Sequence, residues 1–304
     1  MRAKYAGMNS LIGAPMHRGG LLILQTYFDC FPCFIDQALR AGRMATDDER
    51  KIKRLLDEVG MMLKDIRLES TPPETARLIY QKVKKITGKS DPYRKIKKEN
   101  TAKALTLYPS LKRTVEASSD RLLAAIRLAV AGNVMDFGAS KDFDIEAEIN
   151  EIFQRKFAIL DSTEFREYLD KSEEVLFIAD NAGECVFDRL LIEEMKKRVT
   201  YVVRGVPVVN DATYEDAVQA GLDKVALIMP SGTDAPGTIL ATCSQEFRRI
   251  YDRSSFIISK GQGNYEALCD EKRPIFFFLK AKCEVIAKDV GVNQGDIVLK
   301  AINV

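Results

Sequence analysis

The chain has 304 residues, which is enough for one large domain or two ordinary ones, and 46% of them are hydrophobic while 30% are charged. This composition is typical of a soluble globular protein. Its 46 basic and 44 acidic residues leave a net charge of +2, so bulk charge gives no reason to expect a nucleic acid or a membrane as partner. The longest apolar runs, such as residues 21–24 and 275–278, fall far short of the roughly 20 residues that span a bilayer. We therefore expect a cytoplasmic protein.

The N-terminal segment, residues 1–26, is expected to be a flexible extension, because polar residues, a proline and glycines interrupt its apolar positions and prevent a signal-peptide core. The sequence CFPC follows and places Cys30 and Cys33 at a helix start. Such a pair can be structural, redox-active or metal-binding. A tetrahedral zinc site needs four ligands, and the chain has no second CxxC and only His17 as an imidazole. The pattern favours structural thiols and leaves redox or metal use as alternatives.

Residues 27–170 are predicted to form an all-helical domain. Their apolar residues recur at helical spacing, and no alternating strand pattern appears. Thr71 precedes two prolines and a glutamate, which is the signature of a helix start. The tripeptide at 90–92, Ser-Asp-Pro, begins another helix in the same way.

Residues 171–304 show a different pattern, in which short apolar runs alternate with amphipathic segments. Buried strands with intervening helices predict a three-layer α/β domain with a mainly parallel sheet. The boundary between the two domains is expected at residues 170–172. The apolar runs are EVLFIAD, VTYVVRG, KVALIMP, SFIISKG, PIFFFLK and DIVLKAINV.

Polar side chains follow several of these runs, at the edge of a parallel sheet where ligands bind. Asp180 and Asn181 end the first run, and Asp211 follows the second. Carboxylate and amide oxygens are the ligands that hard divalent cations such as Mg²⁺ or Mn²⁺ prefer, and such sites also accept Co²⁺ or Ni²⁺ according to availability. These residues therefore form a candidate metal site. The plainer alternative is that each is the N-cap of the next helix.

A cation held in this way would leave coordination positions open for a phosphate group. Lys260, after the fourth run, and the backbone amides near Gly183 and in the 231–233 turn would help to neutralise that phosphate. A water molecule activated by the cation or by a carboxylate could then attack phosphorus. Attack by Asp180 or Asp211 through a phospho-aspartate is the alternative.

Several motifs, in one order along the chain, closely resemble those of the metal-dependent damage-control phosphatases, a family long described only as a domain of unknown function. The CFPCF near the start is similar to the family's prokaryotic subfamily with paired cysteines. The similarity runs from about residue 27 to 300. The motifs are DNAGE, RGVPVVNDAT, SGTDAPGT, SKGQGNYEAL and FFFLKAKCEVIAKDVGVNQGD.

The resemblance implies a helical domain packed on an α/β domain, and a metal-dependent phosphomonoester hydrolase that acts on phosphorylated sugars or damaged phosphometabolites. It places the metal on Asp180, Asn181 and Asp211, with catalytic roles for Asp180, Asp211 and Lys260. It also brings the AGNVMDFG element of the helical half to the same cleft. The substrate-binding candidates come from this element, from the 231–233 turn and from the segments after the first and fourth runs. They are Asn133, Asp136, Glu184, Ser231, Gly232 and Asn264.

These substrate contacts have plainer alternatives. Asn133 and Asp136 are equally typical of a helix end, and Glu184 is equally typical of an acid in the first turn of a helix. Arg204 and Lys280 are weaker candidates for phosphate or sugar contacts.

The main alternative function is a nucleotide- or adenosylmethionine-binding Rossmann-like protein, such as a methyltransferase. Such sites need a glycine-rich turn after the first strand, and DNAGE supplies a single glycine there. A third, non-enzymatic hypothesis treats the helical half as an interaction module and the strand-end residues as caps. The predicted partner is a small phosphorylated metabolite, with no nucleic acid and no membrane. The sequence leaves its identity, the native cation and the oligomeric state open.

Overall fold

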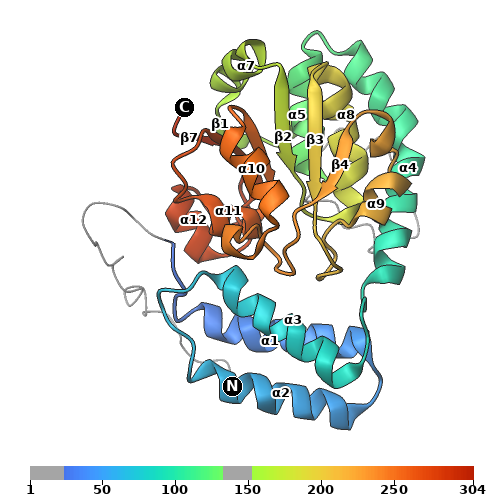
Figure 1. The fold of residues 1–304 in the computed structure, drawn as a ribbon. Coiled ribbons are helices and arrows are strands. Elements are labelled where there is room, and N and C mark those ends of the chain that lie inside the picture. The colour runs from blue at the N-terminus through green and yellow to red at the C-terminus, as the bar shows by residue number, and fades with distance from the viewer. Residues whose placement is uncertain (1–23, 133–152) are drawn as a thin grey trace, which may run out of the picture.

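The fold combines a sheet, covered by helices on both faces, with a smaller group of helices across one end (Figure 1). The computed structural model describes residues 24–132 and 153–304. Within these ranges no helix is long and apolar enough to cross a membrane.

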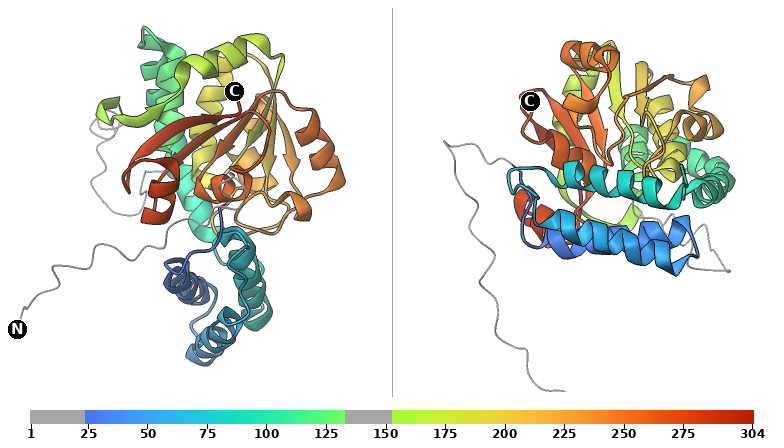
Figure 2. Two further views of the ribbon diagram at one scale, coloured as in Figure 1. Left: turned by 90° about the vertical axis from the view of Figure 1, so that its left-hand side faces the viewer. Right: turned by 60° about the horizontal axis from the view of Figure 1, so that its bottom comes forward.

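Three N-terminal helices form a small layer with a core of its own. Phe34, Leu55 and Ile79 are buried between them. The third helix begins where the sequence predicted: Thr71 is its N-cap and forms a capping box with Glu74. Figures 1 and 2 show this layer lying across one end of the sheet. The helices are α1 (Cys30–Ala45), α2 (Glu49–Leu63) and α3 (Pro72–Thr87).

Two further helices, α4 (Arg94–Ala117) and α5 (Arg121–Ala131), pack against the sheet. Their buried Leu111 and Val130 share one hydrophobic core with Phe177 of the sheet. The contacts of α4 and α5 therefore cut across the predicted division into a helical and an α/β domain, and that division stays a prediction.

The sheet of the described residues has seven strands in the order β1-β7-β6-β5-β2-β3-β4. Neighbouring strands are parallel except β6 and β7, which are antiparallel. All six apolar runs predicted as strands form strands. The bounds are β1 (Phe157–Leu160), β2 (Glu174–Ile178), β3 (Arg198–Val203), β4 (Leu227–Pro230), β5 (Ile257–Lys260), β6 (Ile275–Lys280) and β7 (Ile297–Ile302).

Helices cover both faces of the sheet, which is why its strands read as continuous apolar runs. In β6, Phe276 and Phe278 face the core shared with α4 and α5, while Phe277 and Leu279 face the opposite core. This arrangement confirms the predicted three-layer, mainly parallel α/β fold with an N-terminal helical region. One face carries α7 (Ser162–Lys171), α8 (Cys185–Met195) and α9 (Tyr214–Gln219); the other carries α10 (Gln245–Arg253), α11 (Gln262–Leu268) and α12 (Glu284–Val290). Short 3₁₀ helices lie at Ala182–Glu184, Leu222–Lys224 and Leu240–Thr242.

Strand β1 departs from the expectation that residues 27–170 are all helical. It has four residues, is partly exposed, and pairs with β7 at the end of the sheet. A run of four residues at a sheet edge is too short to show an alternation of apolar and polar residues. The amphipathic segment between β4 and β5 forms an α-helix only from Gln245, because Ser244 caps α10 by accepting the N–H of Phe247 at 3.1 Å.

Strand β2 lies between β3 and β5. The chain therefore leaves β2 in one direction to build β3 and β4, and returns to the other side of β2 with β5. In open parallel sheets a crevice forms at such a switch point, outside the carboxyl ends of the strands. The loops after β2, β3 and β5 meet there.

Candidate active site

The loops that follow β2 and β3 are tied together through their backbones. The N–H of Ala212 donates to the carbonyl of Asp180 at 2.8 Å. Asn181 and Asp211 face each other in an isolated antiparallel bridge. This pairing brings the three predicted metal ligands onto two adjacent backbone segments.

The site is acidic and poorly exposed. Asp180 and Asp211 are 7% and 4% exposed. Burial, with the charges of Glu184 and Asp211, raises the pKa of Asp180 to about 7. Burial also raises the pKa of Asp211, against the opposing charge of Arg204. The amide nitrogen of Asn181 donates to Asp180 at 3.1 Å and to Glu184 at 2.5 Å, so two carboxylates share one neutral donor.

Arg204, a weaker candidate for phosphate contact, is nearly buried and holds Asp211 in place. Its Nε donates to Asp211 at 2.6 Å, and its two terminal nitrogens donate to Thr238 and Asn264, both at 3.0 Å. Asn264 in turn donates to the carbonyl of Ala179 at 2.9 Å. Arg204 and Asn264 thus form a fully hydrogen-bonded support for the loops that carry Asp180 and Asp211.

Lys260 is a buried cation below the site. Its Nζ donates to Glu184 at 2.8 Å and to Asp188 at 2.6 Å, and Tyr201 donates to Asp188 at 2.7 Å. Burial lowers the pKa of Lys260, but the charges of Asp188 and Glu184 outweigh it and raise that pKa above its ordinary value. Lys260 therefore stays charged and neutralises the carboxylates of Glu184 and Asp188.

The buried charges around the site do not balance. Four buried carboxylates meet two buried cations, a formal excess of two negative charges that the exposed Lys282 at the cavity reduces to one. The buried groups are Asp180, Glu184, Asp188 and Asp211 with Arg204 and Lys260. Two carboxylates and an amide are also the donor chemistry that a hard divalent cation takes. In residues 24–132 and 153–304, no cluster of three or more His, Cys, Asp or Glu side chains is arranged as a metal site. The mixed set of two Asp and one Asn fits such a cation by chemistry and by charge.

Gly261 is required by the close approach of Asp180. Its φ is +82°, and a Cβ at this position would lie 2.0 Å from Oδ2 and 2.2 Å from Cγ of Asp180. Real Cβ atoms do not make such contacts, and the left-handed conformation itself favours glycine. The glycine after β5 therefore lets the start of α11 pack directly against the Asp180 carboxylate.

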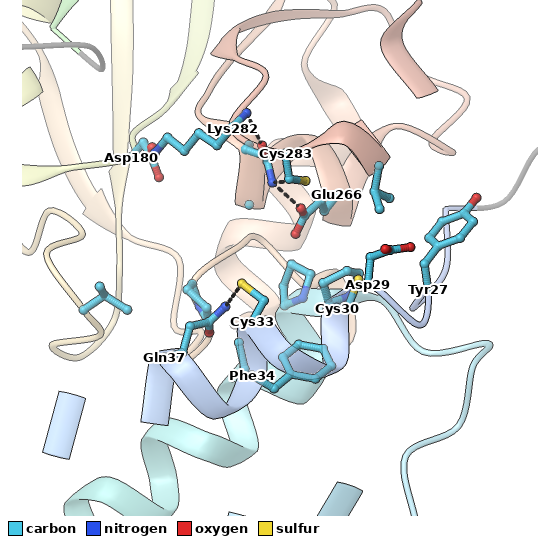
Figure 3. Close-up of a pocket in the computed structure, with 18 of the residues that line it drawn as sticks. Tyr27, Asp29, Cys30, Cys33, Phe34, Gln37, Asp180, Glu266, Lys282 and Cys283 are labelled. Carbon is cyan, nitrogen blue, oxygen red and sulfur yellow. Dashed lines mark hydrogen bonds between the residues drawn. The ribbon is translucent and has the colours of Figure 1, made fainter. Parts of the chain in front are cut away.

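A cavity of about 680 Å³ opens over Asp180, Asn181 and Asp211. This volume is within the range of small-molecule sites. Side chains of α1 and α3, among them Phe34 and Pro73, line one wall, and α11, α12 and the loop between β6 and α12 line another (Figure 3). The N-terminal helical layer thus completes a cavity whose polar floor belongs to the sheet.

The other predicted site residues lie in three places. Glu184, Lys260 and Asn264 are buried beneath the floor and do not line the cavity. Ser231 and Gly232 follow β4, where the Ser231 carbonyl accepts the N–H of Ser244 at 2.9 Å, and they also lie away from the cavity lining. Asn133 and Asp136 lie outside the described residues. The catalytic role of Lys260 and the substrate-binding roles of the other residues stay predictions.

Lys282 is a site residue that the sequence reasoning missed, since it pointed to Lys280 at the end of β6. Lys282 lines the cavity and Lys280 does not. Figure 3 shows the Lys282 side chain extending to Asp180, and its charge lowers the pKa of both Asp180 and Asp211. The sequence LKAK at 279–282 could have indicated Lys282, because a residue two positions beyond the end of a strand can turn into the crevice.

The paired cysteines belong to the wall that α1 contributes. Cys30, Cys33 and Cys283 all line the cavity and all are free thiols. Burial raises the pKa of Cys30 to about 11, so this thiol carries little thiolate at neutral pH. The roles left open for the pair in the sequence analysis stay open.

The fold and the site define an α/β protein with an acidic cavity at the switch point of its sheet, closed on one side by a helical layer. Residues 26–298 match the family model described as the damage-control phosphatase ARMT1-like domain, and the chain belongs to this family. The family resemblance carried by the motifs is confirmed, whereas the subfamily with paired cysteines stays a prediction.

Two archaeal relatives and one solved structure match over almost their full lengths. The chain is 37% identical over 284 residues to an uncharacterised protein of Methanocaldococcus jannaschii, covering 89% of this chain and 93% of that protein. It is 36% identical over 285 residues to a damage-control phosphatase of Archaeoglobus fulgidus, covering 90% and 98%. The crystal structure of a DUF89 family protein from Pyrococcus horikoshii matches with a TM-score of 0.84 at 32% identity, covering 90% of this chain and 98% of that one.

Proposed function

We propose that this protein is a phosphatase that hydrolyses phosphomonoesters of small metabolites, with a divalent cation held by Asp180, Asn181 and Asp211. The observation that carries the proposal is the convergence of these three oxygen-bearing side chains on the floor of one cavity. Membership of a family described as phosphatases, and relatives named damage-control phosphatases, support the reaction class. The comparisons do not favour the methyltransferase alternative.

The residues around the cation site have distinct roles in this proposal. A bound divalent cation would neutralise the excess negative charge and stabilise charge on the phosphoryl oxygens. Lys282 would bind a phosphate oxygen through a charge-assisted hydrogen bond. Arg204 and Lys260 would keep Asp211 and Glu184 in place as the phosphate enters, which is the preorganisation that phosphoryl transfer depends on.

The substrate class follows from the size of the cavity and from the family. A volume of about 680 Å³ leaves room for an organic group beyond the phosphate, so sugar phosphates or damaged phosphometabolites are the proposed substrates. Water is the proposed nucleophile, and trapping of an aspartyl phosphate on Asp180 or Asp211 would favour the covalent alternative.

Hydrolysis of phenyl phosphate, measured after chelation and after re-addition of Mg²⁺, Mn²⁺, Co²⁺ or Ni²⁺, tests the proposal. We expect no turnover without metal and recovery with at least one of these ions. Asp180→Asn and Asp211→Asn should each lower kcat/KM by about 100-fold or more, because each removes a charged ligand. Asp252→Asn, at an exposed position of α10, is the matched control. Activity retained in both site variants would contradict the metal assignment.

A further inference from the structure

The cavity contains a second acidic position that the proposed reaction does not use. Glu266 of α11 lines the cavity, and in Figure 3 its carboxylate points into the cavity on the side away from Asp180. One of its oxygens accepts a hydrogen bond from the amide of Gln262 at 2.8 Å. Among the described residues, no other hydrogen bond or ion pair is made to this carboxylate. Glu266 therefore offers acceptor positions to whatever occupies the cavity.

Gln262 holds this carboxylate in a fixed orientation. It stands one helical turn before Glu266, at the i, i+4 spacing that brings side chains into contact. Its amide oxygen accepts the backbone N–H of Lys282 at 2.8 Å, while its amide nitrogen donates to Glu266. Both ends of the Gln262 amide are thus engaged, and the free acceptor positions belong to Glu266.

The surroundings of Glu266 indicate which kind of ligand group its carboxylate would accept a hydrogen bond from. Burial raises the pKa of Glu266 to about 7, and the charge of Lys282 offsets only part of this effect. Glu266 is half-buried and its carboxylate has a single hydrogen-bond donor, so a ligand that donates hydrogen bonds would use its remaining acceptor positions. A hydroxyl group is a suitable donor, because it can donate to the carboxylate without adding another charge beside Lys282, which lines the same cavity.

We propose that Glu266 binds a hydroxyl group on the organic part of the substrate, and that it thereby selects hydroxylated phosphomonoesters over unsubstituted ones. The inference rests on the proposed function in one respect: it places the phosphate at the Asp180 end of the cavity. Phe34 and Pro73 also line the cavity, so a ligand with a hydroxylated edge and a less polar face suits this lining.

Binding measurements test the subsite without depending on turnover. Dissociation constants for a hexose monophosphate and for inorganic phosphate are measured by calorimetry with the wild-type protein, Glu266→Ala and Glu266→Gln. We expect Glu266→Ala to weaken hexose monophosphate binding about tenfold or more, as for a lost hydrogen bond to a charged group, and to leave phosphate binding within about twofold. Glu266→Gln should be intermediate, because its amide oxygen still accepts. Glu271→Ala, in the segment after α11 and outside the cavity lining, is the matched control.

Turnover separates this inference from the proposed function. In Glu266→Ala, kcat/KM should fall for the hexose monophosphate and stay unchanged for phenyl phosphate. An equal fall for both esters, no change for either, or a wild-type protein that binds no hexose monophosphate would overturn the role of Glu266. Wild-type protein that binds the hexose monophosphate without hydrolysing it, with binding lost in Glu266→Ala, would support the subsite and contradict the proposed phosphatase.

Discussion

The acidic residues at the cavity floor and directly beneath it are held by neighbours outside the cavity lining. Arg204 fixes Asp211 and Lys260 fixes Glu184, both through hydrogen bonds shorter than 3 Å. Gly261 leaves room for Asp180. These three residues do not line the cavity, so their substitution should change the position of the carboxylates before it changes any ligand contact.

Gly261→Ala tests this at the residue scale. The added methyl group would overlap the Asp180 carboxylate, so we expect kcat/KM to fall about 100-fold through displacement of that side chain. Gly291→Ala is the matched control, because Gly291 has a similar φ of +85° and nothing within 4 Å of an added Cβ. Gly291→Ala should lose about 1 kcal/mol of stability from its positive φ, and Gly261→Ala should lose more because its methyl group also overlaps Asp180; denaturant unfolding measures both losses. Equal activity in the two variants would contradict the steric argument.

Lys282→Ala should raise KM for phosphomonoesters and lower kcat/KM about 10- to 100-fold, because a charge-assisted contact to phosphate is lost. Lys280→Ala is the control: Lys280 is a lysine of the same segment that does not line the cavity, and its loss should leave the kinetics unchanged. Steady-state kinetics on phenyl phosphate decide between the two lysines. A larger effect from Lys280 would contradict the structure.

At the scale of elements, α3 connects the helical layer to the α/β part. Arg77 and Gln81 of α3 both bind the carboxylate of Asp234, the latter at 2.7 Å. An added Cβ on Gly237 would lie 2.9 Å from Pro73 at the start of the same helix. The loop after β4 and helix α11, which also contacts α3, therefore hold α3 against the cavity.

Asp234→Ala should loosen this connection. Arg77 and Asp234 are each 32% exposed, so we expect a modest loss of about 1 kcal/mol that is concentrated in α1–α3. Amide hydrogen exchange should become faster in these helices, and KM should rise several-fold because one wall of the cavity moves. Glu174→Ala, which removes one member of an exposed ion pair with Arg198, should change neither quantity. Unchanged exchange in α3 would rule out this role of Asp234.

The elements themselves were largely predictable. The capping box at Thr71 and the apolar runs of β2 to β7 are local patterns, and the structure confirms them. Strand β1 escaped notice because it is short and lies at the sheet edge. Helical periodicity also could not show that α4 and α5 pack against the sheet. It indicates that one face of a helix is buried, but it does not identify the element that covers this face.

At the scale of the whole molecule, the buried acids make stability depend on pH and on metal. Folding raises the pKa of Asp180 to about 7, of Asp188 to about 6 and of Glu266 to about 7, all above ordinary values near 4. Each of these three groups therefore binds more protons in the folded state than in the unfolded state between about pH 4 and pH 7. The stability that these groups contribute is lost as the pH rises through this window.

Melting temperatures measured with a chelator from pH 4.5 to pH 8 test this dependence. The contribution of these acids to the melting temperature should fall with rising pH, and Asp180→Asn should make that fall shallower. Added Mn²⁺ should raise the melting temperature more at pH 8 than at pH 5, because protons compete with the cation for the carboxylates. Identical pH profiles for the wild-type protein and Asp180→Asn would contradict the assignment of this effect to Asp180.

The sequence alone determined strands β2 to β7, their order along the chain and the oxygen-bearing residues at their ends, because these follow from short-range periodicity and from residues adjacent to each run. Only the tertiary structure decided that Lys260 is buried as a counter-ion, that Lys282 rather than Lys280 enters the cavity, and that Glu266 and α1 complete its walls. Those outcomes depend on the pairing of β5 with β2 in the sheet. This pairing brings residues near 180 close to residues near 260 and 282. Contacts over such separations leave no local pattern, because they are set by how whole layers pack.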